Sequence, residues 1–155
     1  MIKSLISVFI VISFVATSQA SPIPPAPNLN VKAYVVMDFD SKMILASSNK
    51  DLTLPPASRT KMMTAYVAFT ELKEKNISLD EEILVSKKAW KTGGSKMFIE
   101  VGKRVKVRDI LQGVITVSGN YASVALAEHI SGDEKTFTTY MNQMATNLGL
   151  RNTNY

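Results

Sequence analysis

Residues 56–64 read Pro56-Ala57-Ser58-Arg59-Thr60-Lys61-Met62-Met63-Thr64, and they decide the fold of this 155-residue chain. The prolines just before Ser58 help to fix where a helix begins. Ser58 and Lys61 stand three residues apart, so on that helix they share a face, and the lysine side chain is long enough to fold back toward the serine. The stretch therefore predicts a helix whose first turn presents a serine beside a lysine.

This spacing has chemical meaning because a serine hydroxyl is a poor nucleophile unless a neighbouring base takes its proton. A lysine can be that base when burial or nearby positive charge lowers its pKa. A serine at a helix start also has its own backbone N–H free to form half of an oxyanion hole. Spacing alone leaves a second interpretation open, in which Ser58 is a helix cap and Lys61 a solvated first-turn residue.

The beginning of the chain has the pattern of a targeting segment. Lys3 supplies a positive start, an apolar run extends over residues 5–15, and Ser18-Gln19-Ala20 offers the small residues that a signal peptidase reads. We expect residues 1–20 to be a cleaved signal peptide, with a retained membrane anchor as the alternative. The run is shorter than the about 20 apolar residues that span a bilayer. The chain is therefore expected to be exported.

Hydrophobic periodicity predicts one hairpin followed mainly by helices. The proline-rich residues 21–32 are expected to form an extended lead-in, and residues 33–46 a β-hairpin with a turn at 38–42. A strand is expected at 83–85. Four helices are expected. Their apolar positions are Met62, Tyr66, Phe69 and Leu72 on the buried face of the first helix, Val107, Ile110, Leu111, Val114 and Ile115 in the second, residues 122–130 in the third, and Phe137, Tyr140, Met141, Met144 and Leu148 in the fourth. The fourth helix is expected to start at Asp133-Glu134 and to end at Gly149.

Composition narrows the range of chemistry. The chain has no cysteine, which excludes disulfides, thiolate metal sites and cysteine nucleophiles, and its one histidine, His129, makes a Ser-His-Asp triad or a zinc site a poor hypothesis. The net charge of +5 includes a basic patch at Lys87, Lys88 and Lys91. Without aromatic interleaving or a nucleic-acid motif, we interpret this patch as a solvated face, so no nucleic acid partner is expected.

Residues 56–64 closely resemble the active-site segment of the low-molecular-mass penicillin-binding proteins, the D-alanyl-D-alanine carboxypeptidases. A second family motif, S-x-N, follows at Ser118-Gly119-Asn120. Further segments are similar to the same family: residues 93–98 (Gly-Gly-Ser-Lys-Met-Phe), residues 125–130, and the pairs Met141-Asn142 and Leu148-Gly149. The resemblance runs from about Ala33 to Tyr155, so residues 33–155 are identified as the N-terminal part of the catalytic domain.

The resemblance implies an α+β chain with the β-lactamase/transpeptidase-like fold and a role for each motif residue. Ser58 would attack the carbonyl between the two terminal D-alanines of a peptidoglycan stem peptide, and Lys61 would accept its proton. Ser118 would relay a proton to the leaving group, and Asn120 would hydrogen-bond the substrate backbone and Lys61. β-Lactams would acylate Ser58 as inhibitors. Neither a metal nor an organic cofactor is implied. A periplasmic location is implied, and association with the inner membrane surface is compatible with it.

The sequence departs from the family pattern in four places. Lys91-Thr92-Gly93 spells the third family motif, K-T-G, but precedes S-x-N, so we interpret it as a coincidence. The third motif and the later sheet strands are expected beyond Tyr155, which makes the fold incomplete and leaves only the N-terminal hairpin and a cluster of helices. Arg59 replaces a residue that is often apolar, and Tyr121 stands where aspartate is common.

Two other functions stay open. A class A β-lactamase shares the serine–lysine motif and the fold, but Glu128 and Glu134 come too early to be its deacylating glutamate. The stronger rival is a truncated, non-catalytic remnant or a muropeptide-binding fragment, which the absence of the third motif favours. Formation of a penicillin adduct on Ser58 discriminates between an enzyme and a remnant.

Overall fold

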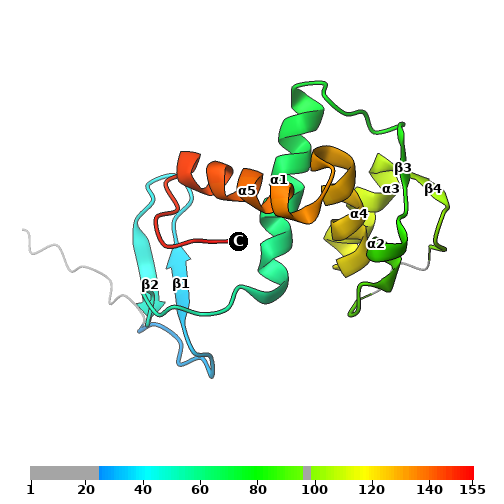
Figure 1. Cartoon of the computed structure of the whole chain (residues 1–155). Coiled ribbons are helices and arrows are strands. Elements are labelled where there is room, and N and C mark those ends of the chain that lie inside the picture. Colours follow the sequence, from blue (N-terminus) through cyan, green and yellow to red (C-terminus); the bar gives the residue numbers. More distant parts are fainter. Residues whose placement is uncertain (1–24, 96–98) are drawn as a thin grey trace, which may run out of the picture. The chain divides into compact units, whose positions relative to one another are not determined.

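A computed structural model describes residues 25–95 and 99–155 (Figure 1). The expected signal peptide (1–20) and the first part of the expected lead-in (21–24) lie outside the described residues. The chain divides into two compact units, one that ends at Thr53 and one that runs from Leu54 to Tyr155. None of the helices in the described ranges is long and apolar enough to cross a membrane.

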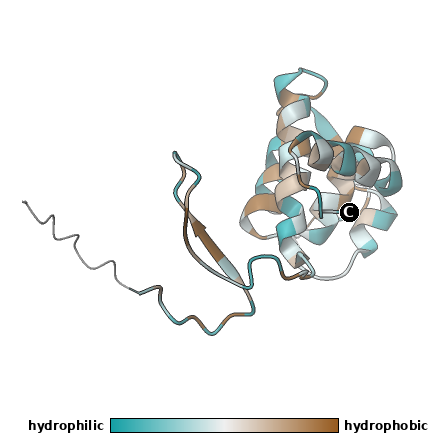
Figure 2. Ribbon diagram, turned by 90° about the vertical axis from the view of Figure 1, so that its left-hand side faces the viewer, coloured by the Kyte–Doolittle hydropathy of each residue, from teal (hydrophilic) through white to brown (hydrophobic). Residues whose placement is uncertain are grey.

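The first unit contains the predicted hairpin. Strand β1 (Tyr34–Met37) pairs antiparallel with β2 (Ile44–Ser48), with an irregular register after Val36. Asp38 organises the turn, because its Oδ1 accepts a hydrogen bond from the backbone N–H of Ser41 at 2.8 Å. Apolar side chains of both strands are exposed, and Figure 2 shows the hydrophobic colouring along the hairpin. A two-stranded hairpin of this kind is marginally stable by itself.

The second unit is mainly helical, as the sequence predicts. The expected strand at 83–85 is β3, displaced by one residue, and it pairs antiparallel with β4, a strand that the sequence patterns did not indicate. The short helix α2 was also not expected. The elements of this unit are η1 (Ala57–Arg59), α1 (Thr60–Lys73), β3 (Glu82–Leu84), α2 (Lys87–Lys91), β4 (Arg104–Lys106), α3 (Val107–Thr116), α4 (Asn120–Ser131) and α5 (Glu134–Asn147).

Helix α4 is the centre of the second unit, as its nearly continuous apolar sequence predicts. It packs against α1, α3 and α5, and its alanines allow the neighbouring helices to approach closely. One hydrophobic cluster joins α3, α4, β3 and Ala68 of α1. A second cluster joins Met63 and Val67 of α1 to Ala127 of α4 and to α5. Helix α1 therefore packs with α4 in both clusters, and this packing fixes the position of the first turn of α1.

The predicted buried face of α1 is wrong for three of its four residues, and only Leu72 packs against the core. Met62, Phe69 and Tyr66 are 72%, 51% and 43% exposed, whereas Met63 is 5% exposed and Val67 is fully buried. Helix α1 has apolar residues on two sides, and periodicity alone selected the side with the larger ones. The helix instead buries the side that fits against α4 and α5. Glu71 is also on the buried side, where the Tyr140 hydroxyl and the Asn76 amide donate to its carboxylate.

The other predicted helices are confirmed, with two corrections to their faces: Ile115 and Leu148 are both exposed. In α3 four of the five apolar positions are buried, but Ile115 is 58% exposed. Helix α5 begins as expected, because Asp133 is its N-cap and accepts a hydrogen bond from the N–H of Thr136 at 2.9 Å. Gly149, with φ at +74°, follows the last turn of α5 as predicted.

Candidate active site

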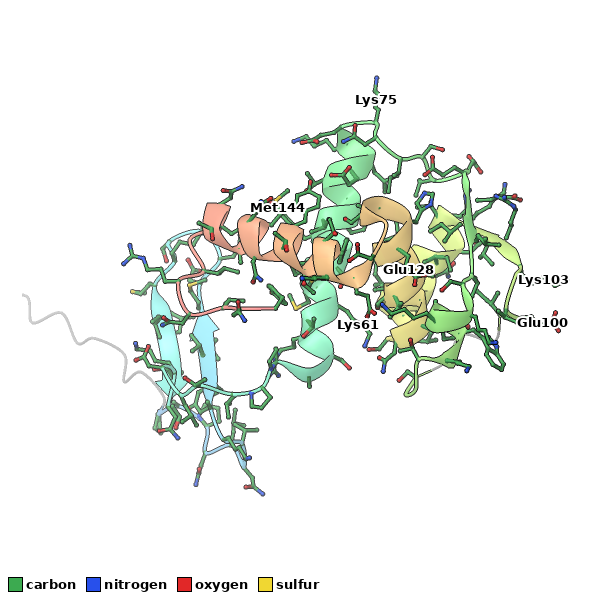
Figure 3. The ribbon with its side chains drawn as sticks, viewed as in Figure 1. Lys61, Lys75, Glu100, Lys103, Glu128 and Met144 are labelled. Carbon is green, nitrogen blue, oxygen red and sulfur yellow. The ribbon has the colours of Figure 1, made fainter. Side chains whose placement is uncertain are left out.

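Ser58 and Lys61 lie at the junction of η1 and α1. The residue before the serine, Ala57, has φ at +49°, a left-handed conformation that non-glycine residues rarely adopt. This sharp turn leaves Ser58 exposed at the helix start. Within the described residues, neither its hydroxyl nor its backbone N–H has a hydrogen-bond partner. Figure 3 shows Lys61 on the side of α1 that faces α4.

Ser118 and Asn120 come from the connection between α3 and α4. Ser118 also has a left-handed backbone, with φ at +53°. The next residue, Gly119, donates its N–H to the Gly113 carbonyl at 3.0 Å. A side chain at Gly119 would be crowded, because a Cβ there would lie 3.3 Å from that carbonyl oxygen. The tight turn brings Asn120 to the first position of α4.

The structure brings all four predicted residues together. Lys61 Nζ donates to Asn120 Oδ1 at 2.7 Å, which links α1 to α4. Ser58, Lys61 and Ser118 line one cavity of about 330 Å³. The rest of its wall is apolar: Met62, Ala65, Phe69, Val114 and Ile115. Met62 and Phe69, which the periodicity of α1 predicts to be buried, therefore line this cavity instead.

Residues 93–95 form a part of the site that the sequence analysis did not assign. Asn120 Nδ2 donates to the Gly93 carbonyl at 2.8 Å. The backbone N–H of Asn120 donates to the Ser95 carbonyl at 3.0 Å. Glycines between two polar stretches predict a loop, and no local pattern connects that loop to a residue 25 or more positions later. The K-T-G sequence at Lys91-Thr92-Gly93 starts at the last residue of α2 and continues beyond the helix, so it does not lie on a strand.

Three further residues, Tyr121, His129 and Trp90, lie outside the lining of the cavity. Tyr121 is 3% exposed, and its hydroxyl accepts the N–H of Ile99 at 3.1 Å, so it anchors the chain segment beside α4. His129 Nε2 lies 2.5 Å from Glu81 Oε1, and this hydrogen bond is the main reason why the pKa of the Glu81 carboxyl is lowered. Trp90 is 48% exposed.

The polar side chains that line the cavity carry two hydroxyls and one amine, and the Asn120 amide is hydrogen-bonded to that amine. Among residues 25–95 and 99–155, no group of three or more acidic or histidine side chains could hold a metal ion. A hydroxyl near an amine can act as a nucleophile in acyl transfer when the amine accepts its proton. The arrangement is therefore compatible with covalent catalysis by Ser58.

The sequence has relatives among known proteins. A family model described as D-alanyl-D-alanine carboxypeptidase matches residues 18–155. The chain is 43% identical over 132 residues to the D-alanyl-D-alanine carboxypeptidase DacA of Haemophilus influenzae, covering 83% of this chain and 34% of the relative. It is 42% identical over 136 residues to DacC of Escherichia coli, covering 84% and 34%. The chain thus spans about a third of the length of the curated relatives it matches.

Solved structures show the same relationship. The carboxypeptidase DacD from Francisella tularensis superposes with a TM-score of 0.83 at 42% identity, over 88% of this chain and 33% of that chain. Penicillin-binding protein 5 from Haemophilus influenzae superposes with a TM-score of 0.82 at 43% identity, over 86% and 39%. Over the matched residues the chain has the transpeptidase-like fold of penicillin-binding proteins. This chain belongs to the D-alanyl-D-alanine carboxypeptidase family.

Proposed function

We propose that this chain forms the acylation site of a serine D-Ala-D-Ala carboxypeptidase, which removes the terminal D-alanine from peptidoglycan stem peptides. The observation that carries the proposal is the shared cavity of Ser58, Lys61 and Ser118, with Lys61 hydrogen-bonded to Asn120 at 2.7 Å. Family membership supplies the substrate class. Export to the periplasm and a part in peptidoglycan biosynthesis and cell-shape maintenance belong to the same proposal.

The chemistry is nucleophilic acyl transfer. Ser58 Oγ attacks the carbonyl carbon between the two D-alanines, and the amine of Lys61 takes the hydroxyl proton. As the C–N bond breaks, Ser118 passes a proton to the leaving nitrogen, and free D-alanine departs. Water then hydrolyses the ester on Ser58, which releases the shortened peptide and restores the hydroxyl. The free backbone N–H of Ser58 is placed to stabilise the oxyanion.

Asn120 has a supporting part in this scheme. Its Oδ1 fixes the position of the Lys61 amine, and its place at the start of α4 brings it near the cavity where the substrate backbone would lie. The apolar wall provided by Met62, Phe69 and Ile115 would exclude water from one side of the scissile bond. β-Lactams would enter as mimics of the D-Ala-D-Ala end and acylate the same hydroxyl.

Detection of a penicillin adduct by intact-mass spectrometry tests the proposal. Opening of the β-lactam ring loses no leaving group, so the mass should rise by that of one whole penicillin molecule in the parent chain and stay unchanged in Ser58→Ala. Ser118→Ala should slow adduct formation by about a hundredfold, because it removes a proton relay. A folded parent without an adduct, or an adduct that persists in Ser58→Ala, would favour the non-catalytic remnant.

A further inference from the structure

The Asn120 amide can serve Lys61 in only one of its two orientations. In the structure Oδ1 accepts from Lys61 Nζ at 2.7 Å, and Nδ2 donates to the Gly93 carbonyl at 2.8 Å. A half-turn of the amide would place Nδ2 against the Lys61 donor and Oδ1 against the Gly93 acceptor, which would break both hydrogen bonds. The Gly93 carbonyl therefore selects the orientation that presents Oδ1 to Lys61.

The same loop also holds the backbone of Asn120. Asn120 is the first residue of α4, where backbone N–H groups lack partners within the helix. The N-cap residue Gly119 has no side chain to satisfy them. The Ser95 carbonyl accepts the Asn120 N–H at 3.0 Å and so satisfies the first of these N–H groups from outside the helix. Residues 93–95 thus hold Asn120 by two hydrogen bonds, one to its side chain and one to its main chain.

Gly94 leaves the space that these two hydrogen bonds need. It lies between the two carbonyls and has φ at +91°. A Cβ at Gly94 would be 2.2 Å from Asn120 Nδ2 and 3.1 Å from its Cγ, whereas a Cβ at the neighbouring Gly93 would meet nothing within 4 Å. Any side chain at Gly94 would therefore have to displace the Asn120 amide.

We propose that Gly94 is a positioning residue of the acylation site: the absence of a side chain at this position lets residues 93–95 lock the Asn120 amide, and through it the Lys61 amine, in the orientation needed for proton transfer. This inference rests on the proposed function. Gly94 itself touches neither the substrate nor the reacting atoms, and it acts only through Asn120.

The first test compares two glycine substitutions that both place a side chain on a residue with a positive φ. Gly94→Ala introduces the clash with Asn120, whereas Gly102→Ala, at φ +77°, places a Cβ in open space. Gly94→Ala should lower the rate of penicillin acylation by about a hundredfold, the effect of misplacing a catalytic group by about 1 Å. Gly102→Ala should leave the rate unchanged. Equal losses in both variants would show that strain alone is responsible and would overturn the proposal.

A double-mutant cycle separates positioning from general damage. Asn120→Ala removes the atoms that a Cβ at Gly94 would meet. In that background Gly94→Ala should cause no further loss of acylation, and it should lower the melting temperature by no more than Gly102→Ala does in the parent. If Gly94→Ala by itself fails to fold, recovery of folding in the double variant is the expected result. Additive losses, or a double variant that stays unfolded, would contradict an action through Asn120.

A second readout does not depend on acylation. The Lys61 amine should react several times faster with a limiting dose of acetic anhydride in Gly94→Ala than in the parent or in Gly102→Ala, because it loses its tie to Asn120. Peptide mass spectrometry would measure this rate against the exposed Lys75 as an internal reference. Unchanged Lys61 labelling in folded Gly94→Ala would overturn the positioning role. If the parent forms no penicillin adduct, the proposed function is contradicted. The effect of Gly94 on the position of Lys61 is then decided by the labelling result alone.

Discussion

At the scale of single residues, two of the left-handed backbone positions belong to the candidate site. Ala57 and Ser118 both adopt left-handed conformations, with φ at +49° and +53°. Each such residue costs about 1–2 kcal/mol relative to the right-handed region. Strain of this size persists where the surrounding structure over-determines the backbone, and it is common at sites of chemistry. Here the packing of α1, α3 and α4 holds both turns, which brings Ser58 and Ser118 to the same cavity.

Tyr140 provides a pH-dependent link between α5 and α1. Burial, and then the hydrogen bond from its hydroxyl to Glu71 Oε1, raise the pKa of Tyr140 to about 12. A tyrosine in the unfolded chain ionises near pH 10. Because the folded-state pKa is the higher one, the stabilisation is complete below about pH 10 and is lost as the pH rises through about 12.

We therefore expect the free energy of unfolding to fall between about pH 10 and about pH 12 in the parent, and to fall less steeply in Tyr140→Phe. Urea unfolding at several alkaline pH values would measure both slopes. Tyr155, whose pKa is also raised by burial, supplies the comparison, since Tyr155→Phe leaves the hydrogen bond to Glu71 intact. Parallel pH dependences in the parent and Tyr140→Phe would show that this hydroxyl does not carry the effect.

At the scale of elements, two helices end with the same motif but with different residues at the left-handed position. In α5 the N–H groups of Leu150 and Gly149 donate to the carbonyls of Ala145 and Thr146. In α1 the N–H groups of Asn76 and Lys75 donate to the carbonyls of Glu71 and Leu72. Gly149, at φ +74°, suits this position, whereas Lys75 adopts φ +63° with a side chain.

Lys75→Gly should accordingly stabilise the chain by about 1 kcal/mol, because glycine adopts the left-handed conformation without a Cβ penalty. Figure 3 shows the Lys75 side chain pointing away from the protein at the end of α1, so its removal costs no packing. Chemical denaturation of the parent and the variant would measure the change. Gly149→Lys is the reverse substitution in the same motif and should destabilise by a similar amount. Changes of the same sign in both variants would contradict this explanation.

Local chemistry explains which elements could be predicted from the sequence. The cap Asp133, the terminator Gly149 and the apolar run of α4 act within a few residues, and each of these features is where the pattern predicted it. Strand β4 has three residues and is defined by its pairing with β3, about 20 positions earlier, which no local pattern encodes. Helix α2 has five residues, too few for a periodicity to appear.

At the scale of the whole molecule, the sequence indicated the family, the four candidate residues and the hydrogen bond between Lys61 and Asn120, but not the loop that holds Asn120. The motifs around Ser58 and Ser118 are short and specific, so their residue types could be read directly. The hydrogen bonds between residues 93–95 and Asn120 depend on tertiary packing and could not be inferred from the spacing of the motifs. The choice between the two apolar sides of α1 also depends on its neighbours, because both sides have helical periodicity.

Adjacent methionines on α1 test where the core of the molecule lies. Met63 is 5% exposed in the cluster with α4 and α5, whereas Met62 is 72% exposed beside the cavity of Ser58. Met63→Ala should reduce the free energy of unfolding by about 2–5 kcal/mol, because it leaves a void in a packed core. Met62→Ala should change it by less than about 0.5 kcal/mol. Urea unfolding of the two variants gives both values with the same substitution on the same helix. A large loss in Met62→Ala would mean that the side of α1 predicted from periodicity is covered in solution, and that Met62 contributes to the stability of the molecule as well as to the wall of the site.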